Sequence, residues 1–146
     1  MRPAEIHRHV CQAFDTFVQH RIEGHGPPNW DVRRADLAGW IRGLDASVAF
    51  AGLLSILESE SRYQYQDLAG ELLTRGGIPC PLALPEFMRR AFSLWNPSAS
   101  SVPRYAAQVF GREVILNFIR ANQTVDLDQP KREAVQYWLG EHPAKG

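Results

Sequence analysis

Four histidines and a glutamate near the start of the chain are residue types that bind zinc or iron: His7, His9, His20, Glu23 and His25. On a helix, His20 and Glu23 are three residues apart and share a face. His7 and His9 are two apart, so their side chains diverge. The residues around His20 match neither the His-Glu-x-x-His zinc motif nor its inverse. Ordinary surface histidines are the favoured interpretation, and a metal-dependent helical-bundle enzyme using His20 and Glu23 is the alternative.

The two cysteines are the candidate nucleophiles. Cys11 falls on an amphipathic helical pattern, where a free cysteine usually behaves as a small buried hydrophobe. Cys80 lies between two prolines, with no histidine nearby in sequence to activate it. The chain contains neither a Gly-x-Ser-x-Gly nucleophile motif nor a glycine-rich phosphate loop. We therefore expect two reduced thiols, no catalytic residue, no bound metal and no cofactor.

A third group has the mixture of aromatic and charged residues that is enriched at protein interfaces. We predict a partner-binding surface formed by Trp30, Glu58, Glu60, Arg62, Tyr63 and Tyr65. Trp30 follows two prolines and is expected in a loop, where no periodic pattern buries it. Tyr63 has the core as its alternative. The other three tryptophans fall on helical stripes and are predicted to be core: Trp40, Trp95 and Trp138.

Apolar residues that recur at spacings of three and four predict the elements that must position these side chains. The expected helices span residues 3–22, 37–42, 46–59, 62–75, 86–95, 102–110, 112–121 and 129–139. Asp36, Asp45 and Asp128 are the predicted N-caps. Gly111 is expected to separate two of the helices. No alternating strand pattern occurs, so we predict an all-α single domain over residues 1–146, with seven or eight short helices in antiparallel pairs.

Composition and charge limit the classes of partner. With 146 residues, 45% of them hydrophobic and 22% charged, the chain has an ordinary globular composition. Sixteen basic and sixteen acidic residues cancel, which argues against nucleic-acid binding through phosphate neutralisation. The longest uncharged apolar run, residues 46–57, is shorter than the roughly 20 residues that span a bilayer. The first residues lack the apolar stretch of an export signal, so we expect a soluble, cytoplasmic protein.

A short motif recurs at helical positions. Residues 37–41 read Leu-Ala-Gly-Trp-Ile, residues 68–72 read Leu-Ala-Gly-Glu-Leu, and residues 104–109 form a more distant third copy. A glycine inside a helix costs about 1 kcal/mol relative to alanine. We therefore predict that Gly39 and Gly70 lie where two helices approach closely.

On this motif, residues 36–121 resemble HEAT-like helical repeats, which implies stacked helical pairs. An irregular helical bundle is the alternative. In size and class the chain is also similar to bacterial toxin-immunity proteins, which implies a cognate toxin whose active cleft Glu58, Glu60, Tyr63 and Tyr65 would cover. We predict a non-catalytic protein-binding module of this kind. A small regulatory or adaptor subunit, dimeric through Trp30 or Trp138, is a further alternative.

Overall fold

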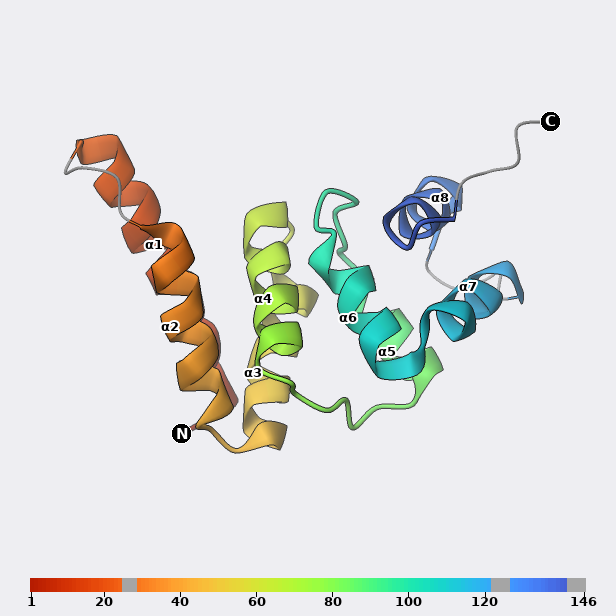
Figure 1. Cartoon of the computed structure of the whole chain (residues 1–146), viewed down its shortest axis with the longest axis horizontal. Coiled ribbons are helices and arrows are strands. Elements are labelled where there is room, and N and C mark those ends of the chain that lie inside the picture. Colours follow the sequence, from red (N-terminus) through yellow and green to blue (C-terminus); the bar gives the residue numbers. More distant parts are fainter. Residues whose placement is uncertain (25–28, 122–126, 142–146) are drawn as a thin grey trace.

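The protein is all helical. The computed structural model describes residues 1–24, 29–121 and 127–141, and these residues form eight helices and no strand (Figure 1). The helices are α1 (Pro3–Glu23), α2 (Trp30–Arg42), α3 (Ala46–Ser59), α4 (Tyr63–Arg75), α5 (Leu84–Ala91), α6 (Ser101–Phe110), α7 (Arg112–Ala121) and α8 (Gln129–Trp138). The predicted all-α class is confirmed. None of the described helices is both long and apolar enough to cross a membrane.

Most of the helices pack in two rows, with α1, α3 and α5 in the first row and α2, α4, α6 and α8 in the second, while α7 packs on α6. Helix α1 packs on α3 and α3 on α5, while α2 packs on α4, α4 on α6 and α6 on α8. Figure 1 shows the row of α2, α4 and α6 in front of the row of α1, α3 and α5, and the helices follow one another from the N-terminal to the C-terminal side. A single apolar cluster runs through the described helices. Each helix therefore buries one face mainly against its neighbours in these rows.

Two predicted aspartate caps and the predicted glycine break lie where the sequence places them. The side chain of Asp45 accepts hydrogen bonds from two backbone N–H groups at the start of α3, and Asp128 accepts one at the start of α8. Gly111 has φ of +96° between α6 and α7. A side chain is strained in that conformation, so glycine is the residue that permits the break.

Two helix boundaries differ from the prediction by more than two residues. Helix α2 begins at Trp30, because the side chain of Asn29 caps it by accepting a hydrogen bond from the N–H three residues on. Asp36 therefore lies within the helix and is not its cap, and Trp30 is not in a loop. The first turns of α2 are mostly polar, which hid their helical period. Helix α5 ends at Ala91, before the predicted end at residue 95.

One buried polar side chain joins the junction of α3 and α4 to the segment between α5 and α6. Gln66 is fully buried. Its amide nitrogen donates to the carbonyl oxygens of Glu60, at 2.7 Å, and Leu94, at 2.9 Å. Its amide oxygen accepts from the backbone N–H of Asn96 at 2.8 Å. Because each of these groups would otherwise lose a partner, Gln66 fixes where α4 begins relative to the segment between α5 and α6.

Of the two motif glycines, only Gly70 lies at a close helix contact. A Cβ on Gly70 would meet Ser101 of α6, with the Ser101 carbonyl carbon at 2.9 Å and the backbone nitrogen of Val102 at 3.0 Å. The prediction is confirmed for this residue. Gly39 is exposed, and its nearest neighbour would be Arg42 Nη2 at 3.7 Å, so the prediction is wrong there.

A third glycine sets the position of α1. A Cβ on Gly52 of α3 would lie 2.7 Å from Cβ of Ile6 and 2.9 Å from the Pro3 carbonyl oxygen. At the next residue of α1, His7 Nδ1 lies 2.8 Å from Ser55 Oγ of α3. The first turns of α1 are therefore level with the middle of α3. Since α1 has 21 residues and α3 has 14, α1 continues well past the end of α3.

We call residues 14–23 of α1 and 29–36 of α2 the overhang. The buried residues of α1 are Ile6, Val10 and Ala13, and those of α2 are Leu37, Ala38 and Ile41. None of the overhang residues is buried. Figure 1 shows these ends of α1 and α2 projecting together at the upper left. The overhang is thus a pair of helix ends that extends beyond the core.

The two motif glycines should respond oppositely to alanine. Gly70→Ala forces α4 away from the α6 backbone, so we expect a loss of about 1–3 kcal/mol in the free energy of unfolding. Gly39→Ala adds a methyl group in open space inside a helix, so we expect a gain of up to about 1 kcal/mol. Urea denaturation followed by circular dichroism measures both. Equal effects of the two substitutions would contradict the close contact at Gly70.

Candidate functional site

An aromatic cluster holds the overhang to the core. The ring of Phe14 lies 5.7 Å from that of Trp30 and 5.0 Å from that of Tyr65, both edge to face. Phe17 stacks on Trp30 with the ring centroids 4.6 Å apart. Two residues predicted for one surface, Trp30 and Tyr65, therefore meet through Phe14, which the prediction did not include. The cluster joins α1, α2 and α4 at one corner.

Tyr65 is a core residue of this corner rather than an exposed anchor. Its side chain is buried, and its hydroxyl donates to the carboxylate of Asp15. Burial, followed by the charge and hydrogen bond of Asp15, raises the pKa of Tyr65 to about 12. The Arg62 guanidinium lies over the Tyr65 ring, 4.3 Å from its centroid. Most of the Tyr65 side chain is therefore covered within the chain, and its contact with a partner stays a prediction.

The two predicted glutamates are bound within the chain. Glu58 accepts two hydrogen bonds from Arg90 of α5, each 3.0 Å long, so it faces α5 and not the aromatic cluster. Glu60 accepts from Nε and Nη2 of Arg62 at 2.8 and 3.0 Å, and this pairing lowers the pKa of Glu60. Both carboxylates therefore have cationic partners within the chain, and their predicted contact with a toxin stays a prediction.

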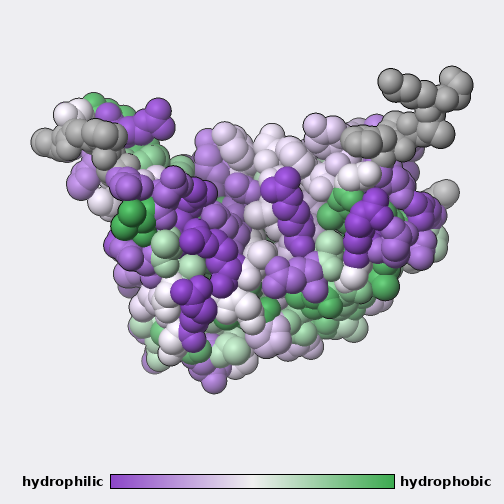
Figure 2. Space-filling view, in the orientation of Figure 1, coloured by the Kyte–Doolittle hydropathy of each residue, from purple (hydrophilic) through white to green (hydrophobic). Residues whose placement is uncertain are grey.

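Beside the cluster, a hollow of about 480 Å³ separates the end of α1 from the start of α4. We call it the notch; it is lined by Phe14, Phe17, Val18, Arg21, Ile22, Tyr63 and Gln64. Ile22 is 74% exposed and Tyr63 is 43% exposed. In Figure 2, apolar side chains reach the surface at the upper left, where the overhang projects. Tyr63 is thus a predicted residue that lies exposed in the notch, beside residues that the prediction missed.

Ile22 shows why the notch escaped the sequence prediction. Its spacing places it on the apolar stripe of α1, and the stripe predicts an inward side chain. The stripe is in fact longer than the helix that covers it, because α3 ends at Ser59 while α1 runs on. The one sequence signal was the length of the apolar pattern in residues 3–22 compared with that in residues 46–59.

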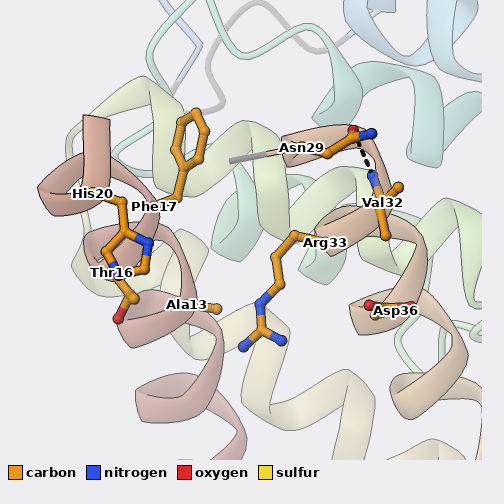
Figure 3. Close-up of a pocket in the computed structure, with 8 residues that line it drawn as sticks. All are labelled: Ala13, Thr16, Phe17, His20, Asn29, Val32, Arg33 and Asp36. Carbon is orange, nitrogen blue, oxygen red and sulfur yellow. Dashed lines mark hydrogen bonds between the residues drawn. The ribbon is translucent and has the colours of Figure 1, made fainter. Parts of the chain in front are cut away.

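A second hollow, of about 390 Å³, lies between α1 and α2 on the overhang (Figure 3). It is lined by Ala13, Thr16, Phe17, His20, Asn29, Val32, Arg33 and Asp36. Figure 3 shows the Arg33 side chain extending into the space between the two helices, with the His20 ring on the α1 side. Phe17 lines both hollows.

The candidate metal ligands do not converge within the described residues. His20 and Glu23 are exposed on the last turns of α1. His7 and His9 lie near the other end of the same helix, where His9 contacts Trp40 with the ring centroids 4.3 Å apart. No group of three or more histidine, cysteine, aspartate or glutamate side chains suited to a metal occurs in the part of the chain that the structure describes. His25 lies outside those residues.

The candidate nucleophiles are not activated. Burial raises the pKa of the Cys11 thiol to about 11 and also raises that of Cys80, so both thiols are protonated at neutral pH. His7 and Ser55 form a pair that the sequence did not reveal. The Ser55 hydroxyl donates to the carbonyl oxygen of Gly52 at 2.7 Å, so its proton is not directed at the histidine. The hydrogen bond between His7 and Ser55 links α1 to α3.

No protein-family model, curated protein or solved structure matches this chain. The resemblances to HEAT-like repeats and to immunity proteins therefore gain no support from a relative.

Replacing Tyr65 by phenylalanine tests the link between α1 and α4. The variant keeps the ring contact with Phe14 but loses the hydrogen bond to Asp15, so we expect a loss of about 1 kcal/mol at neutral pH. The folded state raises the pKa of Tyr65 from 10.0 to about 12, so its neutral phenol stabilises the fold below pH 10. The wild-type chain should lose this stabilisation as the pH rises from 10 to about 12.

Urea denaturation across that pH range distinguishes the two chains. The free energy of unfolding should fall more steeply for the wild type than for Tyr65→Phe. Parallel curves would show that the Tyr65 hydroxyl does not contribute as described.

Proposed function

We propose that the protein is a non-catalytic protein-binding module and that the notch is its docking surface. The observation that carries the proposal is the exposed apolar surface on the overhang, with Ile22 74% and Tyr63 43% exposed beside the ring of Phe14. Large apolar side chains that gather around a hollow and lie open to water are typical of interaction sites. Burying them against a partner would supply the main driving force for binding.

The surroundings of the notch support this role. Phe14, which lines the notch, packs against Trp30 and Tyr65, so this part of the surface is formed before a partner arrives. A preformed surface loses less conformational entropy on binding than a mobile one does. Arg21 and Gln64 lie at the edges of the same hollow. An apolar centre with a polar rim is the usual arrangement of protein interfaces.

A cognate toxin is the first partner class to test, as the likeness to immunity proteins implies. In this form of the proposal the notch, and not Glu58 and Glu60, makes the central contact. A toxin gene directly beside the gene for this chain would support the immunity role. An operon of metabolic enzymes would favour the regulatory or adaptor role.

A charge placed in the notch should abolish partner binding without unfolding the chain. Ile22 is mostly exposed, so Ile22→Glu should change the free energy of unfolding by less than about 0.5 kcal/mol. We expect it to weaken a co-purified partner, rebound as a purified protein, by at least about tenfold. Val114→Glu is the matched control, because Val114 is an exposed valine, 48% accessible, on the distant α7.

Calorimetry of the purified partner with the three chains gives the affinities. The proposal fails if the Ile22→Glu chain binds as tightly as the wild type, or if Val114→Glu weakens binding to the same extent.

A further inference from the structure

We infer that a hollow between α2, α4 and α6 binds a small zwitterion of the α-amino-acid type, with its ammonium group at Asp67 and its carboxylate at Arg104. We call this space the polar hollow. It shares no lining residue with the notch, so its ligand is separate from the partner proposed above.

The polar hollow differs from the hollows of the overhang in the chemistry of its walls. All the residues that line it have polar or charged side chains, whereas a phenylalanine lines both the notch and the hollow between α1 and α2. Figure 2 shows hydrophilic side chains along the space between α4 and α6. The volume is about 290 Å³. Small-molecule pockets usually measure about 300–1,000 Å³, so this hollow suits a small, polar ligand.

Two of the four charged residues that line the polar hollow neutralise each other. Arg34 Nη1 of α2 lies 3.2 Å from Glu71 Oε2 of α4. Arg34 also pairs with Asp31, and Glu71 pairs with Arg75 at 3.4 Å. Two cations and two anions therefore balance in this network, which leaves no net charge for a ligand.

The other two charged residues have opposite signs and are not paired. Asp67 and Arg104 form no ion pair with each other or with any other residue in the part of the chain that the structure describes. A ligand with one charge would complement one of them and leave the other unmatched. A ligand with an ammonium group and a carboxylate complements both, and the site stays neutral overall.

The fold places Asp67 before a ligand arrives. Asp67 Oδ1 accepts from the backbone N–H of Ser101 at 2.9 Å, and the Ser101 hydroxyl donates to the Asp67 carbonyl oxygen at 2.6 Å. Both donors are neutral, so the carboxylate keeps its negative charge. Its second oxygen has no hydrogen bond within the described residues and can accept one from an ammonium group.

The position of Arg104 is fixed by two contacts of α6. Its guanidinium lies over the Trp138 ring, 5.6 Å from the centroid. The close approach of α4 and α6 at Gly70 sets the separation of the two helices. Arg104 is three residues beyond Ser101, about one helical turn from the residue that bonds Asp67. The two charges are therefore near enough for a small molecule to bridge.

Ser100 gives the polar hollow a third group that can bind a ligand. It directly precedes α6, but its side chain does not cap that helix. A hydroxyl can donate to a carboxylate or accept from an ammonium group. A few polar groups that converge on one space are what orients a small ligand in its site.

Titration of the full chain with each standard amino acid at neutral pH, followed by calorimetry, tests the inference. We expect at least one of them to bind in a one-to-one ratio. Its methyl ester lacks the negative charge and its N-acetyl derivative lacks the positive charge, so each should bind at least about tenfold more weakly. A derivative that binds as tightly as its parent, or no binding by any amino acid, would overturn the inference.

Two conservative variants locate the bound amino acid. Asp67→Asn keeps an oxygen that can accept from Ser101 but loses the negative charge, and Arg104→Gln loses the positive charge. Each should weaken binding at least about tenfold. Asp36→Asn and Arg33→Gln are the matched controls, because both residues are exposed and line a different hollow. Unchanged binding by the first two variants, or equal losses in the controls, would contradict the site.

Two further results separate this site from the notch. Ile22→Glu should leave amino-acid binding unchanged, whatever it does to a protein partner. If Asp67→Asn and Arg104→Gln weaken a co-purified partner while no amino acid binds, the polar hollow belongs to a protein interface and the inference is wrong.

Discussion

The contact between Ile6 and Gly52 determines where the rest of α1 lies. With glycine at position 52, α1 approaches α3 so closely that even one added methyl carbon would stand 2.7 Å from Ile6 Cβ. The hydrogen bond between His7 and Ser55 supports the same register of α1 against α3, closer to the C-terminal end of α3. A helix of 21 residues that begins level with the middle of a helix of 14 residues must run past its end. The overhang and the notch are consequences of that offset.

The overhang combines weak burial with firm attachment. None of its residues is buried, yet Phe14 packs between Trp30 and Tyr65, and Tyr65 is bonded to Asp15. Regions with few buried contacts open more readily than the core does, and binding surfaces are often drawn from them. The aromatic cluster limits this opening at the base of the overhang. Apolar surface can therefore remain exposed there without loss of the fold.

Local sequence patterns predicted what depends on neighbours in the chain. Apolar periodicity identified the helices, and Asp45 and Asp128 were recognised as caps because capping needs only residues two or three positions away. Exposure was not predictable in this way. Ile22 belongs to an apolar stripe but lacks a covering helix, and Tyr65 follows a polar segment yet is buried by α1. Both outcomes depend on the offset of α1 and α3, which arises from a tertiary contact.

Hydrogen exchange of the chain, first in complex with its co-purified partner and then alone, tests the central claim most directly. If the notch is the docking surface, amides in residues 14–23 of α1 and in the first turn of α4 exchange more slowly in the complex, while those of α7 and α8 are unchanged. Slower exchange confined to α7 and α8, with no change in the overhang, would contradict the claim.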